Sequence, residues 1–138
     1  MSSFQRDPVM PDRDSEIVVC AVSRYLPEAS ALAQPGDSRY VFAYTIDIEN
    51  RGERTVQLIS RRWWITDARQ NIREVEGPGV VGQRPVLRPG ETFRYSSWCS
   101  LPTSYGWMRG VYSMIAENSE VIEVPIATFP LSTLQSLN

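Results

Sequence analysis

The chain has 138 residues and a formal net charge of −2. All 14 of its basic residues are arginine, so lysine and histidine are both absent. This composition excludes catalytic pairs built on histidine, zinc sites that contain histidine, Schiff-base lysines and P-loop lysines. Two cysteines are too few for a four-thiolate metal site. With 42% hydrophobic and 22% charged residues, the chain has the composition of one globular domain.

The sequence carries no signal for membrane insertion or export. No apolar run approaches the roughly 18 residues that a transmembrane helix needs. The N-terminal segment carries acidic residues and prolines where a signal peptide has an apolar core. We therefore expect a cytoplasmic protein that does not bind membranes, with Cys20 and Cys99 reduced and packed as small buried hydrophobes. A disulfide between two sheets is the alternative for these cysteines.

Charge is distributed unevenly along the chain. The net charge is −3 over residues 1–38, +3 over residues 39–94 and −2 over residues 95–138. A weakly basic middle segment between acidic ends favours an anionic ligand or partner. It is too weakly charged to predict nucleic-acid binding, which usually needs a strongly basic face.

The pattern along the chain predicts strands separated by turns. Residues 1–15 are expected to form a flexible tail and residues 16–138 one all-β domain. Within residues 39–50, aromatic and aliphatic side chains alternate with small or polar ones, which is the period of a half-buried strand. Residues 27–38 and 77–89 are rich in Pro and Gly and are predicted loops. The predicted strands are 16–26, 39–50, 55–66, 72–76, 91–100, 107–117 and 120–129.

Short strands with regular turn signals and no convincing helix predict an all-β fold, either a sandwich or a barrel. Pro125 cannot donate to a strand ladder, so we expect it at a sheet edge or at a bulge. Trp63 and Trp64 are adjacent in one predicted strand and therefore point to opposite faces. One of these tryptophans is then expected in the core.

The glycine-rich segment after residue 76 has the spacing G-x-G-x-x-G. A dinucleotide site with this spacing needs a following helix, and the β-branched residues and prolines that come next exclude one. Two interpretations stay open. The glycines shape a loop at one end of the fold, or their amides converge on a phosphate beside flanking arginines. The residues of this candidate anion site are Gly77, Gly79, Gly82, Arg73, Arg84 and Arg88.

Aromatic and arginine residues offer a candidate surface for a protein partner. Trp and Arg are enriched in interface hot spots, although sheet surfaces of monomers carry them too. The alternative is therefore a purely structural role. The residues of this candidate interaction surface are Arg61, Arg62, Trp64, Trp98 and Trp107.

The remaining polar residues give no catalytic or metal site. Glu74 pairs with Glu76, and Asp47 with Glu49, on one face of a strand each, which is typical of a solvated face. We expect no catalytic residue, no metal ligand and no cofactor. Tyr112 is expected to close a corner of the sandwich by bonding the backbone through its hydroxyl.

Several characteristic segments follow one another along the chain: Arg39–Tyr44 with Ile48 and Asn50–Gly52, Arg62–Asp67, Val75–Pro85 with Leu87–Gly90, Tyr95–Ser96, Met108–Tyr112 and Ile126–Phe129. In this order they resemble the ApaG family, also called CorD, in its bacterial single-domain form. The block from Val75 to Pro85 is the most specific, and the resemblance covers about residues 16–138.

The resemblance implies an immunoglobulin-like or fibronectin-III-like antiparallel sandwich of seven to eight strands. It also implies an association with cobalt tolerance and magnesium efflux in bacteria, and with a neighbouring diadenosine tetraphosphate hydrolase. We therefore expect a non-enzymatic binding module, and the preferred hypothesis is that it binds a protein partner. The alternative is a module that binds phosphate, pyrophosphate or a dinucleoside polyphosphate at Gly77–Gly82.

Overall fold

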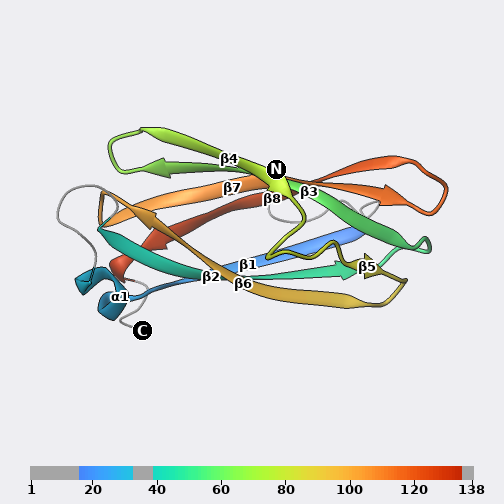
Figure 1. Ribbon diagram of the computed structural model, residues 1–138, viewed down its shortest axis with the longest axis horizontal. Coiled ribbons are helices and arrows are strands. Elements are labelled where there is room, and N and C mark those ends of the chain that lie inside the picture. The colour runs from blue at the N-terminus through green and yellow to red at the C-terminus, as the bar shows by residue number, and fades with distance from the viewer. Residues whose placement is uncertain (1–15, 33–38, 135–138) are drawn as a thin grey trace, which may run out of the picture.

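Two antiparallel β-sheets face each other in the computed structural model, which describes residues 16–32 and 39–134 (Figure 1). The predicted tail, residues 1–15, lies outside the described residues. The elements are β1 (Ile17–Tyr25), α1 (Pro27–Ala31), β2 (Tyr40–Asn50), β3 (Val56–Asp67), β4 (Ile72–Pro78), β5 (Val86–Leu87), β6 (Thr92–Leu101), β7 (Tyr105–Ala116) and β8 (Val121–Ser132).

The core lies between the sheets and follows the predicted alternation. On β2, the buried residues Phe42, Tyr44, Ile46 and Ile48 point inward, and the residues that alternate with them lie on the outer face. Trp63 is buried in the core, where its ring meets Tyr44 at 5.6 Å between centroids. The all-β sandwich and the buried tryptophan are therefore confirmed.

The sheets are unequal in width. One has three strands in the order β1-β2-β6, and the other has five, in the order β4-β3-β7-β8 with β5 paired to β3. Along one side the sandwich is closed, because β1 packs against β8 and the Ser23 hydroxyl donates to the Pro130 carbonyl at 2.6 Å. Along the other side β4 and β6 are both edge strands, and this side holds the candidate site.

Several local predictions need correction. Residues 27–38 were expected to be all loop, but Pro27–Ala31 forms one short helix, because a proline at its start fixes a helical φ. The glycine- and proline-rich stretch contains β5, and β8 continues past Pro130 to Ser132. Pro125 lies on β8, an edge strand, next to a register shift, so that prediction is confirmed.

The two cysteines differ in environment. Both are free, Cys99 is buried as expected, and Cys20 is exposed on β1, so the prediction of a buried Cys20 is wrong. The alternation of β1 explains the error, because Cys20 falls on the outward phase of this strand. Within the part of the chain that the structure describes, no helix has the length and apolar character needed to cross a membrane.

Candidate binding pocket

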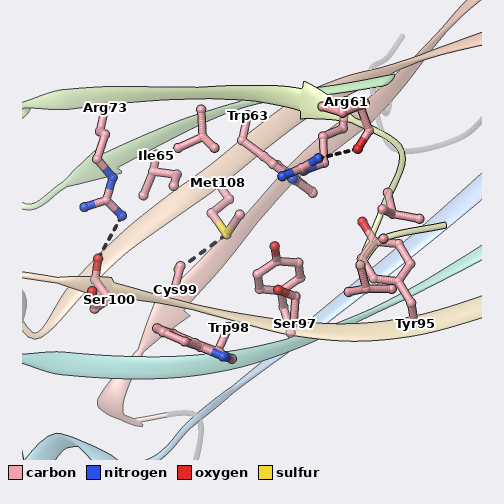
Figure 2. A pocket seen from close by; sticks show the side chains of 16 residues that line it. Arg61, Trp63, Ile65, Arg73, Tyr95, Ser97, Trp98, Cys99, Ser100 and Met108 are labelled. Carbon is pink, nitrogen blue, oxygen red and sulfur yellow. Dashed lines mark hydrogen bonds between the residues drawn. The ribbon is translucent and has the colours of Figure 1, made fainter. Parts of the chain in front are cut away.

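A pocket of about 570 Å³ opens between the edge strands β4 and β6 (Figure 2). Arg73 and Val75 line it from β4, and Ser97 and Ser100 line it from β6. Its floor is formed by inward side chains of β2, β3 and β7, and residues 78–82 cover one end. The pocket is thus a gap between the sheets, not a hollow in one face.

Arg61 enters the pocket because of a bulge in β3. The register with β7 shifts between Leu58 and Ser60. Each side chain after this bulge therefore points to the sheet face opposite the one it would occupy in an uninterrupted strand. Arg61 then points inward with Trp63 and Ile65, and all three line the pocket. An uninterrupted strand would have turned this guanidinium to solvent.

The glycine-rich segment wraps the Arg61 guanidinium with carbonyl oxygens. Nη1 of Arg61 donates to the carbonyls of Pro78 and Gly79, each at 3.0 Å. A Cβ at position 77 would lie 2.9 Å from that nitrogen, so Gly77 leaves the space that the guanidinium fills. The loop therefore orients a cation, and that cation lines the pocket.

Three amides of this segment already have backbone partners. The Gly79 N–H donates to Ile59 O, and Val80 and Gln83 bond to each other in both directions, all at 2.8 Å. These N–H groups do not converge on open space, which an anion nest requires. Phosphate binding by the glycine amides stays a prediction, now with fewer amides available for it.

The six residues of the candidate anion site do not all meet at the pocket. Arg73 and Gly82 line it. Gly77 and Gly79 lie behind Arg61 and support it. Arg88 lies in an exposed turn near Glu91, whose carboxylate is 4.0 Å away. Among the described residues that line the pocket, Arg84 and Arg88 do not appear.

Arg73 forms a bridge across the mouth of the pocket. Its Nη2 donates to the Ser100 carbonyl at 3.1 Å, joining β4 to β6, as Figure 2 shows. This hydrogen bond is exposed to solvent. The two arginines that line the pocket therefore differ: Arg61 is clamped by the loop, and Arg73 holds one exposed carbonyl.

Tyr44, Tyr95 and the indole of Trp63 line the pocket, and Tyr112 is buried next to Tyr95. Tyr95 and Tyr112 share a buried hydroxyl–hydroxyl bond of 2.6 Å, so the predicted backbone partner for Tyr112 is wrong. Burial raises the pKa of Tyr44, Tyr95 and Tyr112, which keeps these phenols neutral. The buried Nε1 of Trp63 is without a hydrogen-bond partner among the described residues.

Cys99, on β6, also lines the pocket, but its thiol is not reactive. Its Sγ lies 3.7 Å from Sδ of Met108. Burial raises the pKa of the Cys99 thiol to about 11, so the thiol stays protonated at neutral pH. Sequence reasoning did not select Tyr44, Tyr95 or Ser97, although the inward phase of β2 and β6 would have grouped them.

The structure divides the candidate interaction surface among three places. Arg62, Trp64 and Trp107 lie on the outer face of the five-stranded sheet, where the Arg109 guanidinium stands 4.4 Å above the Trp64 ring. Trp98 is 68% exposed on β6 at the lip of the pocket. Arg61 lies inside the pocket. The five residues therefore do not form one patch, because alternation sends neighbours to opposite faces.

Arginines neutralise the paired carboxylates. Arg62 contacts Glu74 at 3.3 Å and Glu76 at 2.9 Å. Asp47 accepts from Arg94 at 2.7 Å, and this hydrogen bond lowers the pKa of the carboxyl. In residues 16–32 and 39–134, no three Cys, Asp or Glu side chains gather as a metal site would need.

Comparison with known proteins places the whole arrangement in one family. The family model described as "ApaG domain" matches residues 30–116. Protein ApaG of Bordetella pertussis is 48% identical over 138 residues, which is the full length of both chains. The chain belongs to the ApaG family. Protein ApaG of Ralstonia nicotianae is 47% identical over 89% of this chain and 97% of its own length.

Solved structures agree with the ApaG fold. A crystal structure of an ApaA protein from Bordetella pertussis has a TM-score of 0.76 and 49% identity, covering 84% of this chain and 92% of that chain. The X-ray structure of a structural genomics target has a TM-score of 0.79 and 38% identity, covering 86% and 87%. All residues that line the pocket, from Tyr44 to Met108, fall inside the matched ApaG domain.

Proposed function

We propose that this ApaG domain is a non-enzymatic binding module that holds part of a protein partner in the pocket between β4 and β6. The observation that carries the proposal is the unequal width of the sheets. Among residues 16–32 and 39–134, a three-stranded sheet faces a five-stranded one, so no described strand covers β4 and the pocket between β4 and β6 is open. An open inter-sheet gap with two free strand edges is a surface that partners recognise.

The residues of the pocket support binding and not catalysis. The thiol and phenols there are held neutral by burial, and the chain contains neither histidine nor lysine. General acid–base catalysis favours a group whose pKa lies near the working pH. The arginines supply fixed positive charge, which orients a ligand without transferring a proton.

A second candidate function is the binding of phosphate, pyrophosphate or a dinucleoside polyphosphate at the same place. The observation that favours it is the presence of Arg61 and Arg73 on one pocket, beside residues 78–82. A guanidinium binds phosphate through paired N–H donors. In this function the arginines, and not the glycine amides, provide the contacts.

We place this activity in the cytoplasm, where the free Cys20 and Cys99 stay reduced. The association with cobalt tolerance and magnesium efflux is then a cellular outcome of binding a partner. Direct chelation is not part of the proposal, because the candidate carboxylates Asp47, Glu74 and Glu76 contact arginines.

Site-specific photo-crosslinking tests the proposal. Benzoylphenylalanine replaces Trp98 at the lip of the pocket or, as the matched control, Val22 on the opposite edge strand of the same sheet. These positions are 68% and 66% exposed. After irradiation in a cell extract, we expect a discrete protein adduct from position 98 and none from position 22.

Equal adducts from both positions, or an adduct from position 22 alone, would contradict the proposed site. The second candidate is tested separately by titrating isotope-labelled protein with pyrophosphate. Saturable shifts at residues 78–82 and at Arg61, without a protein adduct at position 98, would favour the small anion over the protein partner.

A further inference from the structure

We infer that the pocket is the place of a strand that the described part of the chain does not provide, and that an extended acidic segment of the partner supplies it by pairing with the edge of β6. The inference rests on the proposed function and names the chemistry of its partner. β1 packs against β8 at the closed side, and β4 lies at the far edge of the wider sheet. A fourth strand beside β6 would face β4 and complete the sandwich (Figure 1).

Alternate residues of β6 form their backbone hydrogen bonds with β2, and the residues between them direct their N–H and C=O groups to the opposite edge. The Asn50 N–H donates to Glu91 O at 2.9 Å, which fixes the phase of the β2–β6 ladder. Because alternate residues of an antiparallel strand bond to the same neighbour, residues 93, 95, 97, 99 and 101 bond toward β2. The N–H and C=O groups of Ser96, Trp98 and Ser100 therefore point toward the open side.

The edge of β4 is less suited to pairing with a partner. The Asp67 N–H donates to Asn71 O, and the Gly79 N–H donates to Ile59 O, which shows which residues of β4 bond to β3. The residues between them direct their backbone N–H and C=O groups away from β3. These outward residues are Ile72, Glu74, Glu76 and Pro78. Pro78 has no N–H, and its carbonyl already accepts from Arg61. Pairing is thus directed to β6.

The pocket receives the side chains of such a strand. Alternate side chains of a strand lie about 7 Å apart on one face, and those that point inward would meet the pocket between β4 and β6. The fully buried Val80 and its loop cover the end near Tyr95. The added strand is therefore short and lies beside residues 96–100.

Charge selects acidic side chains for the inward positions. Arg61 and Arg73 line the pocket, and no Asp or Glu is among the described residues that do so. Pairing with Ser100 O replaces the bridge from Arg73, which frees that guanidinium for a carboxylate. The apolar floor between the arginines, formed by Trp63 and Ile65, suits an aliphatic side chain. Trp98 flanks the added strand on the outer face.

The test uses a defined peptide, Ac-Thr-Glu-Thr-Val-Thr-Glu-Thr-amide, whose inward residues read acidic, aliphatic, acidic. It is titrated into the isotope-labelled full chain, and backbone amide shifts and hydrogen exchange are followed. We expect saturable shifts along residues 96–100 and slowed exchange of the Ser96, Trp98 and Ser100 amides. Arg73→Gln is expected to weaken binding about tenfold, whereas Arg109→Gln on the outer face leaves it unchanged.

Two altered peptides separate ladder pairing from charge. The same peptide N-methylated on the residues that face β6 loses the ladder bonds, and the peptide with Lys in place of Glu reverses the charge; we expect neither to bind. Unchanged exchange of the three amides, or equal binding of the Lys peptide, would overturn the inference. Should position 98 still capture a partner while the peptide fails to bind, only the acidic-strand inference falls and the binding module stands.

Discussion

Asn50 is a fully buried polar residue at the end of β2, and its side chain joins three segments. Its Nδ2 donates to Arg54 O at 2.8 Å and to Leu87 O at 2.9 Å, and its Oδ1 accepts from Gly52 N–H at 2.9 Å. A buried amide with satisfied bonds specifies one local arrangement, because losing any partner leaves a buried polar group unpaired. Asn50 therefore holds the turn after β2 against β5.

Asn50→Ala removes these three hydrogen bonds, so the carbonyls of Arg54 and Leu87 and the N–H of Gly52 lose the Asn50 amide as their partner. We expect the free energy of unfolding to fall by about 3 kcal/mol, measured by urea denaturation. Asn71→Ala, at an exposed turn position, is the control and should change stability by less than about 0.5 kcal/mol. A loss at position 50 no larger than the control would show that solvent or neighbouring groups replace the amide.

The two cysteines differ in expected reactivity. Cys20 is exposed, whereas Cys99 is buried with its pKa raised to about 11. At pH 8 we expect a thiol reagent such as Ellman's reagent to modify Cys20 promptly and Cys99 only after unfolding. Rapid modification of Cys99 in the folded Cys20→Ser variant would mean that the pocket floor opens to solvent.

At the scale of elements, the glycines between β4 and β5 shape a loop that holds the Arg61 guanidinium in place. Gly79 and Gly82 both have positive φ, at 58° and 79°. They differ in surroundings, because a Cβ at position 79 would lie 2.3 Å from the Gln83 carbonyl oxygen and one at position 82 would meet nothing within 4 Å. Gly79 is thus required by contact as well as by conformation.

Substitution of the two glycines by alanine separates these requirements. Gly82→Ala should lower stability by about 1 kcal/mol, which is the cost of a left-handed backbone for alanine. Gly79→Ala should cost about 3 kcal/mol because the Gln83 carbonyl must also move. Thermal unfolding of both variants checks the order. Equal losses would mean that the loop relaxes without cost to its contacts.

A charged clamp joins elements from both sheets. Arg54 contacts Glu16, which precedes β1, and also Glu120 in the turn between β7 and β8 at 2.6 Å. The hydrogen bond from Arg54 lowers the pKa of Glu16 below its ordinary value of 4.5. A carboxyl whose pKa is lower in the folded state stabilises the protein above its unfolded pKa, and this stabilisation is lost as the pH falls.

Glu16→Gln should therefore be less stable than the parent at pH 7, and the difference should shrink as the pH falls below about 4.5. Urea midpoints at several pH values measure this convergence. Glu28→Gln removes an exposed carboxylate of α1 in the same way and is the matched control, whose stability at pH 7 should lie within about 0.5 kcal/mol of the parent. A constant difference between Glu16→Gln and the parent at all pH values would contradict the clamp.

At the scale of the whole molecule, much of the fold could be predicted from the sequence. Alternation on β2 identified the buried face, and the neighbouring tryptophans were assigned correctly to opposite faces, because both follow from local strand geometry. The family also could be predicted, since its segments occur in one order along the chain.

The pocket could not be predicted, because it depends on long-range relations. The bulge in β3 that turns Arg61 inward has no marker in the sequence. That no strand of residues 16–32 and 39–134 faces β4 follows only from the strand order. Arg61 was therefore assigned to a surface, and Tyr112 to a backbone contact. Local patterns predict which face a side chain occupies, but not which two edges end up adjacent.

We propose that this ApaG domain binds its partner in the gap between β4 and β6. The most direct measurement is hydrogen exchange of the full chain with and without the protein captured at position 98. We expect slowed exchange at Ser96, Trp98 and Ser100 and in residues 78–82, with exchange in β1 and β8 unchanged. Protection confined to β1 and β8, or to the outer face around Trp64, would contradict it.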